Sequence, residues 1–315
     1  MCGIAGYLSR RDEPQPVGRI LLDMLTSLAR RGPDSAGVAL FRTEPAHRET
    51  CWIRLPESGD AAAHERRIVA DLAIVGDVGA IERRHGLLRV ELGPNDGPAA
   101  IRRAVERGDE EIEVVSVGRQ LELIKQVGHP DELSGTYPVE DFRGTHAIGH
   151  TRLSTESRVD LTHSQPFWAR GVADLATVHN GHITNYHKLR RMYEQEGTRF
   201  YTENDSEVIG VYLARKFRKG QSLREALAAS VQELDGSFSY LVATADAFGF
   251  AKDAYCLKPM IVAETPGAVA IANEEVAIQA ALGAGYQPRE PGAGATGVWE
   301  VRRPAARPAR RRRAA

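Results

Sequence analysis

Cys2 directly follows the first methionine in the stretch MCGIAGY, and it is one of three cysteines in the 315-residue sequence. Removal of a methionine that precedes a small residue would leave a thiol and a free α-amine on Cys2. A thiol with a pKa of about 8.5 is mostly protonated at neutral pH, and an α-amine with a pKa of about 7.7 to 8.0 can accept its proton. The pattern predicts a cysteine nucleophile that carries its own general base. The alternative is a small buried residue at the start of a strand.

Asn180 and Gly181 lie in the stretch VHNGHITN, where a predicted strand runs into a turn. At such a boundary an asparagine amide and a glycine N–H can both point into a cleft, which is the arrangement of an oxyanion hole. The alternative is a common Asn-Gly turn without a chemical role.

Two charged residues have positions that suit the binding of a small zwitterion. Arg152 lies in GHTRLST on a predicted strand, and Asp205 lies in TENDSEVIG just before a predicted helix. A guanidinium that faces inward can bind a carboxylate through two hydrogen bonds, and a carboxylate can face an ammonium. The alternatives are an exposed arginine on an edge strand and a helix cap formed by Asp205 or Ser206.

The turn RGPDSAG brings Arg31, Gly32 and Asp34 together, either as a simple backbone bend or as support for a neighbouring active-site loop.

His146 and His150 share one face of a predicted strand. No further ligands cluster with these histidines in the sequence, and the cysteines have no CxxC spacing. We therefore expect no metal site and no cofactor.

The elements that must position these residues predict an α+β fold. A helix begins after Pro16 and ends before Gly32, and Ser222 and Glu225 have the spacing of a capping box at the start of another helix. Strands in runs with paired helices between them indicate a layered arrangement rather than a regular βαβ winding. Strands are predicted at 3–8, 35–41, 145–155, 176–183, 237–245, 260–264, 268–272 and 297–301, and further helices at 206–217 and 222–234.

The stretch from about 43 to 145 has a different character, because its charge is higher and its apolar runs are short. It fits either a separate small α/β unit or a long elaboration on the surface of one domain, and the short runs favour the elaboration. We expect one domain over residues 2–301 and a basic, disordered tail over 302–315.

The composition is that of an ordinary globular protein, with 42% hydrophobic and 26% charged residues and a formal net charge of -1. No overall field would attract nucleic acid or an anionic membrane. The first 30 residues lack a signal pattern, and no apolar run approaches the roughly 18 residues that a membrane span needs. Three dispersed cysteines fit a reducing compartment. We expect a cytoplasmic protein that binds neither nucleic acid nor membrane.

The order of the stretches adds a further indication. MCGIAG, RGPDSAG, GHTRLST, THSQPF, VHNG and ENDSEV, spread over residues 2–210, together resemble the class II glutamine amidotransferases, which are N-terminal nucleophile hydrolases. The stretch DGSFSYLVATAD at 235–246 is similar to the central strand of that family. This resemblance implies an αββα sandwich of two antiparallel sheets between helical layers.

The resemblance also implies a reaction. Cys2 would attack the side-chain carboxamide of L-glutamine with its own α-amine as general base, and Asn180 and Gly181 would be the oxyanion donors. A γ-glutamyl thioester and ammonia would form, and water would then release glutamate.

The remaining residues would bind the substrate or support the site. Arg152 and Asp205 would contact the α-carboxylate and α-ammonium of glutamine, which are the two charged groups that free glutamine offers beyond its amide. Arg31, followed by Gly32, is similar to the family arginine that braces the oxyanion loop.

The fate of the ammonia points to a partner. Stretches at 116–128 and 154–191 resemble the stand-alone amidotransferase subunits of glutamate synthase-like proteins, the type found in N-methylglutamate synthase. We expect an ammonia-accepting synthase subunit, with the 43–145 stretch as its candidate docking surface. The alternatives are an amidase of the same fold that acts on another small amide or γ-glutamyl compound, and, less favoured, a non-catalytic subunit that binds glutamine.

Overall fold

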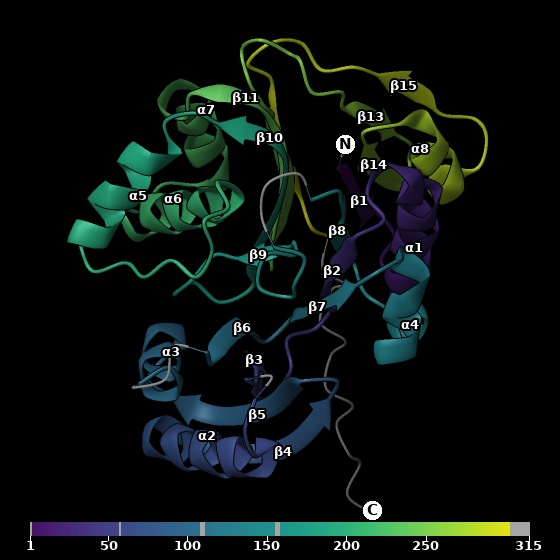
Figure 1. Ribbon diagram of the computed structural model, residues 1–315. Helices are drawn as coiled ribbons and strands as arrows, with labels where there is room; N and C mark the ends of the chain where they lie inside the picture. Colours follow the sequence, from purple (N-terminus) through teal and green to yellow (C-terminus); the bar gives the residue numbers. More distant parts are fainter. Residues whose placement is uncertain (1, 57, 108–110, 155–157, 303–315) are drawn as a thin grey trace, which may run out of the picture.

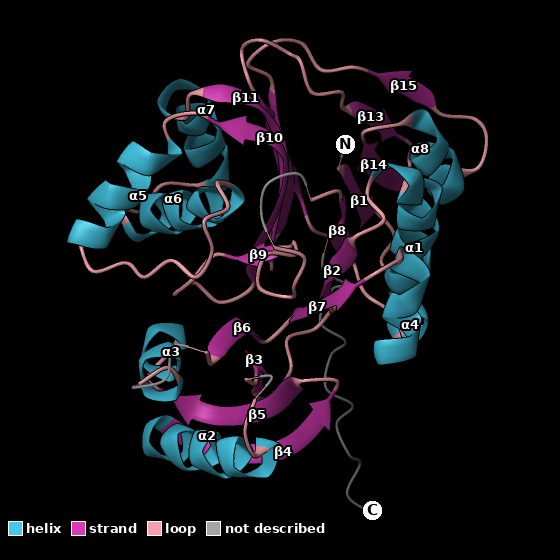
Figure 2. Cartoon of the chain, in the orientation of Figure 1, coloured by secondary structure: helices cyan, strands magenta, loops and turns pink. Residues whose placement is uncertain are grey.

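A computed structural model describes residues 2–56, 58–107, 111–154 and 158–302 (Figure 1). Within these residues the strands form three antiparallel sheets, of seven, five and four strands. The two larger sheets face each other, and helices cover their outer faces (Figure 2). The predicted α+β sandwich with helical outer layers is confirmed. Beyond Arg302, the predicted tail lies outside the described residues.

The seven-stranded sheet contains the N-terminal strand β1 (Gly3–Ser9) near its centre, with all seven residues buried. Successive side chains of a strand point to opposite faces, so Ile4 and Leu8 pack between the two sheets while Ala5 and Tyr7 pack against helices. The sheet order is β15 (Gln287–Arg289), β13 (Ile261–Glu264), β14 (Ala268–Ala272), β1, β8 (His146–Arg152), β2 (Ser35–Phe41) and β7 (Leu121–Val127).

The five-stranded sheet is built around the hairpin of β10 (Leu175–Ile183) and β11 (Gly236–Thr244), which pair over nine residues. Its order is β16 (Thr296–Glu300), β12 (Ala247–Lys252), β11, β10 and β9 (Phe167–Trp168). Side chains such as Val178, Leu241 and Phe248 join Ile4 and Leu8 in one apolar core between the sheets.

Helices cover the outer face of each large sheet (Figure 1). On the seven-stranded sheet lie α1 (Val17–Ser27), α8 (Glu275–Leu282) and the short α4 (Leu133–Thr136); on the five-stranded sheet lie α5 (Tyr186–Gln195), α6 (Ser206–Arg218) and α7 (Leu223–Glu233). The predicted capping box of α7 is confirmed, because Ser222 and Glu225 each bind the other's backbone N–H. The described residues contain no helix long and apolar enough to cross a membrane.

The third sheet lies beside the sandwich with two helices of its own (Figure 1). Its order is β4 (Gly76–Arg84), β5 (Leu87–Asn95), β3 (Glu49–Arg54) and β6 (Glu113–Gly118), and its helices are α2 (Ala61–Val75) and α3 (Pro98–Val105). Buried side chains of this unit, Trp52 and Leu88 among them, belong to the same continuous apolar core as Ile4 and Phe248. The stretch expected as an elaboration at 43–145 thus contains a sheet of its own, while β7 within it pairs with the main sheet.

Candidate active site

The first cavity, of about 480 Å³, opens where the ends of β1, β8 and β10 meet the start of α6. Five of the residues singled out in the sequence line it, which places them within one site although they span more than 200 positions: Cys2, Arg152, Asn180, Gly181 and Asp205. Arg31 and Gly32 are not part of this lining, but both contact residues that are.

Cys2 is positioned by the register of the central strands. Gly3 pairs with Thr151 on β8, so the next position along the antiparallel register sets Cys2 against Arg152. The Cys2 carbonyl accepts hydrogen bonds from Asn180 Nδ2 at 3.2 Å and from Arg31 Nε at 3.1 Å. The thiol is partly exposed, with its Sγ 3.7 Å from the carbonyl oxygen of Leu153. The beginning of the chain is therefore fixed by donors from two other segments.

Arg31 and Gly32 support this arrangement from behind. Arg31 also forms an ion pair with Glu274, so its guanidinium joins the Cys2 backbone to the segment before α8. A Cβ added at Gly32 would lie 2.5 Å from the backbone nitrogen of Arg152, which leaves no room for a side chain there. The turn after α1 thus approaches β8 closely at the residue that lines the cavity.

Asn180 and Gly181 lie on β10, opposite Ser239 and Phe238 of β11. Gly181 has a φ of 133°, and a Cβ at this position would meet the Ser237 carbonyl oxygen at 2.2 Å. Only glycine suits such a backbone. The Asn180 amide nitrogen carries two hydrogens, and one bond to the Cys2 carbonyl leaves the second for a ligand.

Arg152 is buried at the end of β8, and its Nη1 donates to the backbone oxygen of Arg158 at 2.8 Å. Burial lowers the pKa of Arg152, while the nearby Cys2, Asp160 and Asp34 oppose that shift. An arginine keeps its charge under such a perturbation, since its ordinary pKa is above about 12. The first cavity therefore has a fixed cation in its wall.

Asp205 precedes α6 but its side chain does not cap the helix. Its Oδ2 instead accepts the backbone N–H of Ile183 at 2.7 Å and lies 3.5 Å from His182 Nδ1. Asn204 provides the local helix contact, because its Oδ1 accepts the N–H of Ser206. The carboxylate of Asp205 is thus held against the end of β10, where it lines the cavity.

Comparison with known proteins identifies the family. Residues 150–280 match the family described as "Glutamine amidotransferase domain". A protein of Methanothermobacter thermautotrophicus named "Putative glutamine amidotransferase" is 36% identical over 286 residues, which is 89% of this chain and 93% of that protein. The chain belongs to the glutamine amidotransferase family. The glutamine amidotransferase-like protein GlxB of Rhizobium meliloti is also 36% identical, over 87% of this chain and 89% of its own length.

Solved structures show the same fold. The allosteric regulatory enzyme of purine biosynthesis matches 97% of this chain with a TM-score of 0.62 at 20% identity. The glutamine phosphoribosylpyrophosphate amidotransferase from B. subtilis matches 97% with a TM-score of 0.61 at 21% identity. This amidotransferase spans 50% of each of those two chains. The sequence relatives and the fold together identify the chain as an enzyme of the class II, N-terminal nucleophile type.

Three polar residues that also line the cavity of this amidotransferase, Gln165, His179 and Ser206, were not among the predicted site residues. Gln165 donates from Nε2 to the carbonyl of His179 and to Ser206 Oγ, both at 3.1 Å, and accepts the His179 N–H. His179 Nδ1 lies 2.8 Å from Ser206 Oγ, and burial lowers the pKa of His179. These contacts fix the start of α6 against β10. A signal was available, since Gln165 and His179 lie within the matched stretches THSQPF and VHNG.

The two histidines of β8 bind backbone rather than forming a cluster of ligands. His146 Nε2 lies 2.9 Å from the carbonyl of Thr244, and His150 Nε2 lies 3.1 Å from that of His179. Burial lowers the pKa of each to about 3, so both are neutral. Among the described residues, no group of three or more His, Cys, Asp or Glu side chains is placed to hold a metal ion.

Proposed function

We propose that this amidotransferase hydrolyses the side-chain amide of L-glutamine through a thioester on Cys2 and delivers the ammonia to a separate synthase subunit. The observation that carries the proposal is the shared cavity of Cys2, Arg152, Asn180, Gly181 and Asp205. Its volume of about 480 Å³ is in the range of small-molecule sites, which is roughly 300–1,000 Å³.

The nucleophile acts after the first methionine is removed. The Cys2 α-amine then accepts the thiol proton, and the thiolate attacks the amide carbon of glutamine. Asn180 and Gly181 donate to the oxyanion of the tetrahedral intermediate through the amide nitrogen and the backbone N–H. Collapse of the intermediate breaks the C–N bond, ammonia leaves with the proton, and water later releases glutamate.

Substrate binding relies on two opposite charges in the wall of the cavity. The Arg152 guanidinium binds the α-carboxylate, and the Asp205 carboxylate binds the α-ammonium. Both charges come from rigid elements, β8 and the start of α6, so they hold the reacting carbon near Cys2 with little loss of entropy at the moment of reaction. Arg31 braces the nucleophile through the Cys2 carbonyl.

The relatives support a separate acceptor of ammonia. This chain covers 93% and 89% of two relatives, but 44% of the amidophosphoribosyltransferase of Archaeoglobus fulgidus, with which it is 30% identical. Little sequence of the first two relatives lies outside the match. We propose a synthase of the glutamate synthase-like type as the acceptor, in agreement with the resemblance at 116–128 and 154–191.

Glutamine hydrolysis tests the reaction. Intact mass first establishes that Cys2 is the N-terminal residue, and glutamate release is then measured for the wild type and Cys2→Ala. The variant lacks the nucleophile and should lose essentially all turnover. Turnover by Cys2→Ala at the parental rate, or equal hydrolysis of asparagine and γ-glutamyl compounds by the wild type, would contradict the proposal.

The third sheet and its helices form the proposed docking surface for the acceptor. Deleting this unit would expose the apolar core that it shares with the sandwich, so a surface substitution is the better test. Ile74 on α2 is 78% exposed, and Ile74→Asp should weaken capture of the acceptor subunit without altering glutaminase activity. Val276→Asp on α8 is the matched control, since Val276 is also exposed but lies on a helix that covers the seven-stranded sheet and not on the third-sheet unit. If Ile74→Asp captured the acceptor as well as Val276→Asp does, the third sheet would be excluded as the docking surface.

A further inference from the structure

A second cavity, of about 870 Å³, lies between the third sheet and the sandwich. Its wall combines Arg54 and His85 of the third sheet with the segment 158–163 and Tyr201 of the sandwich. It shares no lining residue with the first cavity, and the proposed reaction does not use it. Its size is in the range of sites that bind small molecules, roughly 300–1,000 Å³.

One segment forms part of both cavities. Arg152, Leu153 and Gln165 line the first cavity, while residues 158–163 between them line the second. Arg152 Nη1 donates to the carbonyl of Arg158, and Asp160 accepts from His163 Nδ1 at 2.7 Å. The backbone of Arg158 is therefore bound directly to the proposed carboxylate ligand of the active site.

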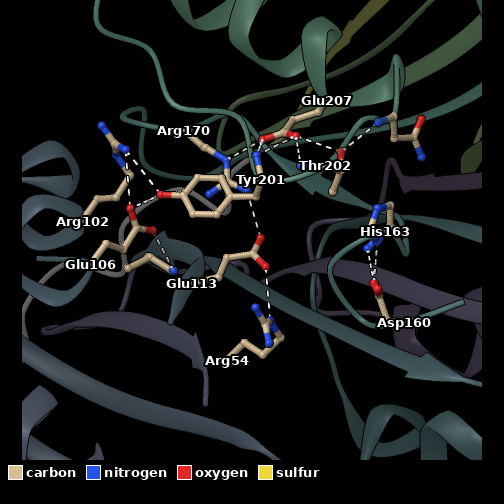
Figure 3. A network of polar contacts seen from close by, with 12 residues as sticks. Arg54, Arg102, Glu106, Glu113, Asp160, His163, Arg170, Tyr201, Thr202 and Glu207 are labelled. Atoms are coloured by element: carbon tan, nitrogen blue, oxygen red, sulfur yellow. Dashed lines mark hydrogen bonds and ion pairs between the residues drawn. The ribbon is translucent and has the colours of Figure 1, made fainter. Parts of the chain in front are cut away.

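A network of polar contacts also connects the second cavity to Glu207, in the first turn of α6 (Figure 3). Tyr201, in the wall of the second cavity, donates its N–H to the Glu207 carboxylate at 3.2 Å, and Thr202 donates to it at 3.0 Å. Glu207 lies in the first turn of α6, two residues after Asp205. Its contacts fix the loop that ends at the proposed ammonium ligand.

The same network extends into the third sheet. Arg170 donates to Glu207 at 3.1 Å and to Glu113 of β6 at 2.9 Å, and Arg54 of β3 lies 3.4 Å from Glu113. The side chains of Arg170, Glu113 and Glu207 are nearly fully buried. A change at Arg54 or Tyr201 would therefore be transmitted through contacts that are costly to break.

The wall of the second cavity carries charges of both signs, with Arg54 and Arg158 beside the acidic residues Glu111 and Asp160. Asp160 is paired with His163, and Arg54 is paired with Glu113. Within the described part of the chain, the side chains of Arg158 and His85 have no hydrogen-bond or ion-pair partner, and both residues are exposed at the cavity. A guanidinium so placed suits a phosphate or carboxylate group. Leu55, Pro56 and Leu161 supply apolar wall for the body of a ligand.

We propose that the second cavity binds a small molecule carrying a phosphate or carboxylate group through Arg158, and that its binding changes the affinity of the first cavity for glutamine. The second part rests on the proposed roles of Arg152 and Asp205, because those are the two residues to which the second cavity is connected. Coupling of this kind typically changes affinity by about 5- to 150-fold, and it is reciprocal between the two ligands.

Calorimetric titration of the full-length protein tests the site without requiring turnover. The probes are inorganic phosphate, citrate and adenosine 5′-monophosphate, which separate phosphate from carboxylate ligands, and adenosine is the uncharged control. At least one anion should bind saturably, Arg158→Ala should weaken it about tenfold or more, and Arg191→Ala, an exposed arginine on α5 outside both cavities, should not. Absence of binding by all three anions, or equal binding by Arg158→Ala, would overturn the site.

The coupling is measured on Cys2→Ala, to which glutamine can bind without being consumed. Its dissociation constant for glutamine should shift by about fivefold or more at a saturating concentration of the bound anion, and the shift should vanish in Cys2→Ala combined with Arg158→Ala. An unchanged dissociation constant would overturn the coupling. If the wild type failed to hydrolyse glutamine, the proposed function would fall, whereas the anion titrations would still decide the second site.

Discussion

The first cavity and the junction with the third sheet are held in different ways. In the first cavity the strand register does most of the positioning: Gly3 pairs with Thr151, and Asn180 pairs with Ser239. At the junction, buried side chains from separate segments meet without a shared ladder, as Arg170 does with Glu113 and Glu207. The comparison shows that backbone pairing sets the geometry of the reacting groups, whereas buried charges connect that geometry to the rest of the molecule.

This difference has a physical basis. A backbone ladder fixes each position by repeated hydrogen bonds, so the loss of one side chain leaves the strand in place. A buried ion pair fixes its members only while both are present, because either one alone is an uncompensated charge. Substitutions in the first cavity should therefore alter rate, and substitutions at the junction should alter stability and affinity.

The largest expected effect is at the junction. Arg170→Met removes the cation shared by Glu113 and Glu207 and should lower the free energy of unfolding by about 3–5 kcal/mol. Chemical denaturation measures it. Arg191→Met, at an exposed position, is the control and should change stability by less than about 0.5 kcal/mol. Similar stabilities for the two variants would mean that the network contributes no structure.

Asn180→Ala tests the first cavity. Loss of one oxyanion donor should lower kcat by about 10²- to 10³-fold, equivalent to about 2.7–4 kcal/mol, because the bond matters only in the transition state. KM for glutamine should change little. Steady-state kinetics separates the two quantities, and a rise in KM with an unchanged kcat would contradict the assignment of Asn180 as an oxyanion donor.

Arg152→Lys tests whether the two parallel N–H donors of the guanidinium are needed. Lysine keeps the charge but lacks the paired donors, so the variant should raise KM for glutamine by about 10- to 100-fold, as expected for losing a charged hydrogen bond of about 1.5–3 kcal/mol. kcat at saturation should fall much less. Equal KM values for variant and wild type would assign the carboxylate of glutamine to another residue.

The smallest expected effect is the change per pH unit that Lys125 on β7 causes in the free energy of unfolding. Burial lowers the pKa of Lys125 from 10.5 to about 8, although Glu113 opposes the shift. Between these values the unfolded chain binds the extra proton, so the free energy of unfolding should rise with pH, by at most about 1.4 kcal/mol per pH unit. Denaturation from pH 7 to 10 should show this rise in the wild type and not in Lys125→Met. If the stability of the wild type and of Lys125→Met changed equally with pH, a group other than Lys125 would be responsible for the rise.

The sequence predicts the first cavity better than the junction, for a physical reason. Cys2, Asn180 and Asp205 lie in short stretches whose residue types indicate their chemistry. The strands and helices that carry them have a clear periodicity of apolar residues. Glu113, Arg170 and Glu207 are charged residues that a sequence presents as solvated surface. Their burial follows only from the packing of segments 57 and 37 positions apart.

Arg31 and β7 show two further limits of the sequence. The resemblance implies that Arg31 braces the oxyanion loop, and the structure adds two contacts that the sequence does not indicate: its Nε donates to the Cys2 carbonyl, and its guanidinium pairs with Glu274. β7 lies within the charged stretch at 43–145 but pairs with β2 in the main sheet. In both cases the contact joins residues far apart in the chain, which local pattern does not encode.

The apolar core that runs from Trp52 and Leu88 to Ile4 and Phe248 makes the third sheet and the sandwich a single cooperative body. Buried side chains of the two parts contact each other along this core, so neither part can melt without exposing the hydrocarbon of the other. Heating should consequently give one calorimetric transition, and a ligand that stabilises either part will raise the melting temperature of both.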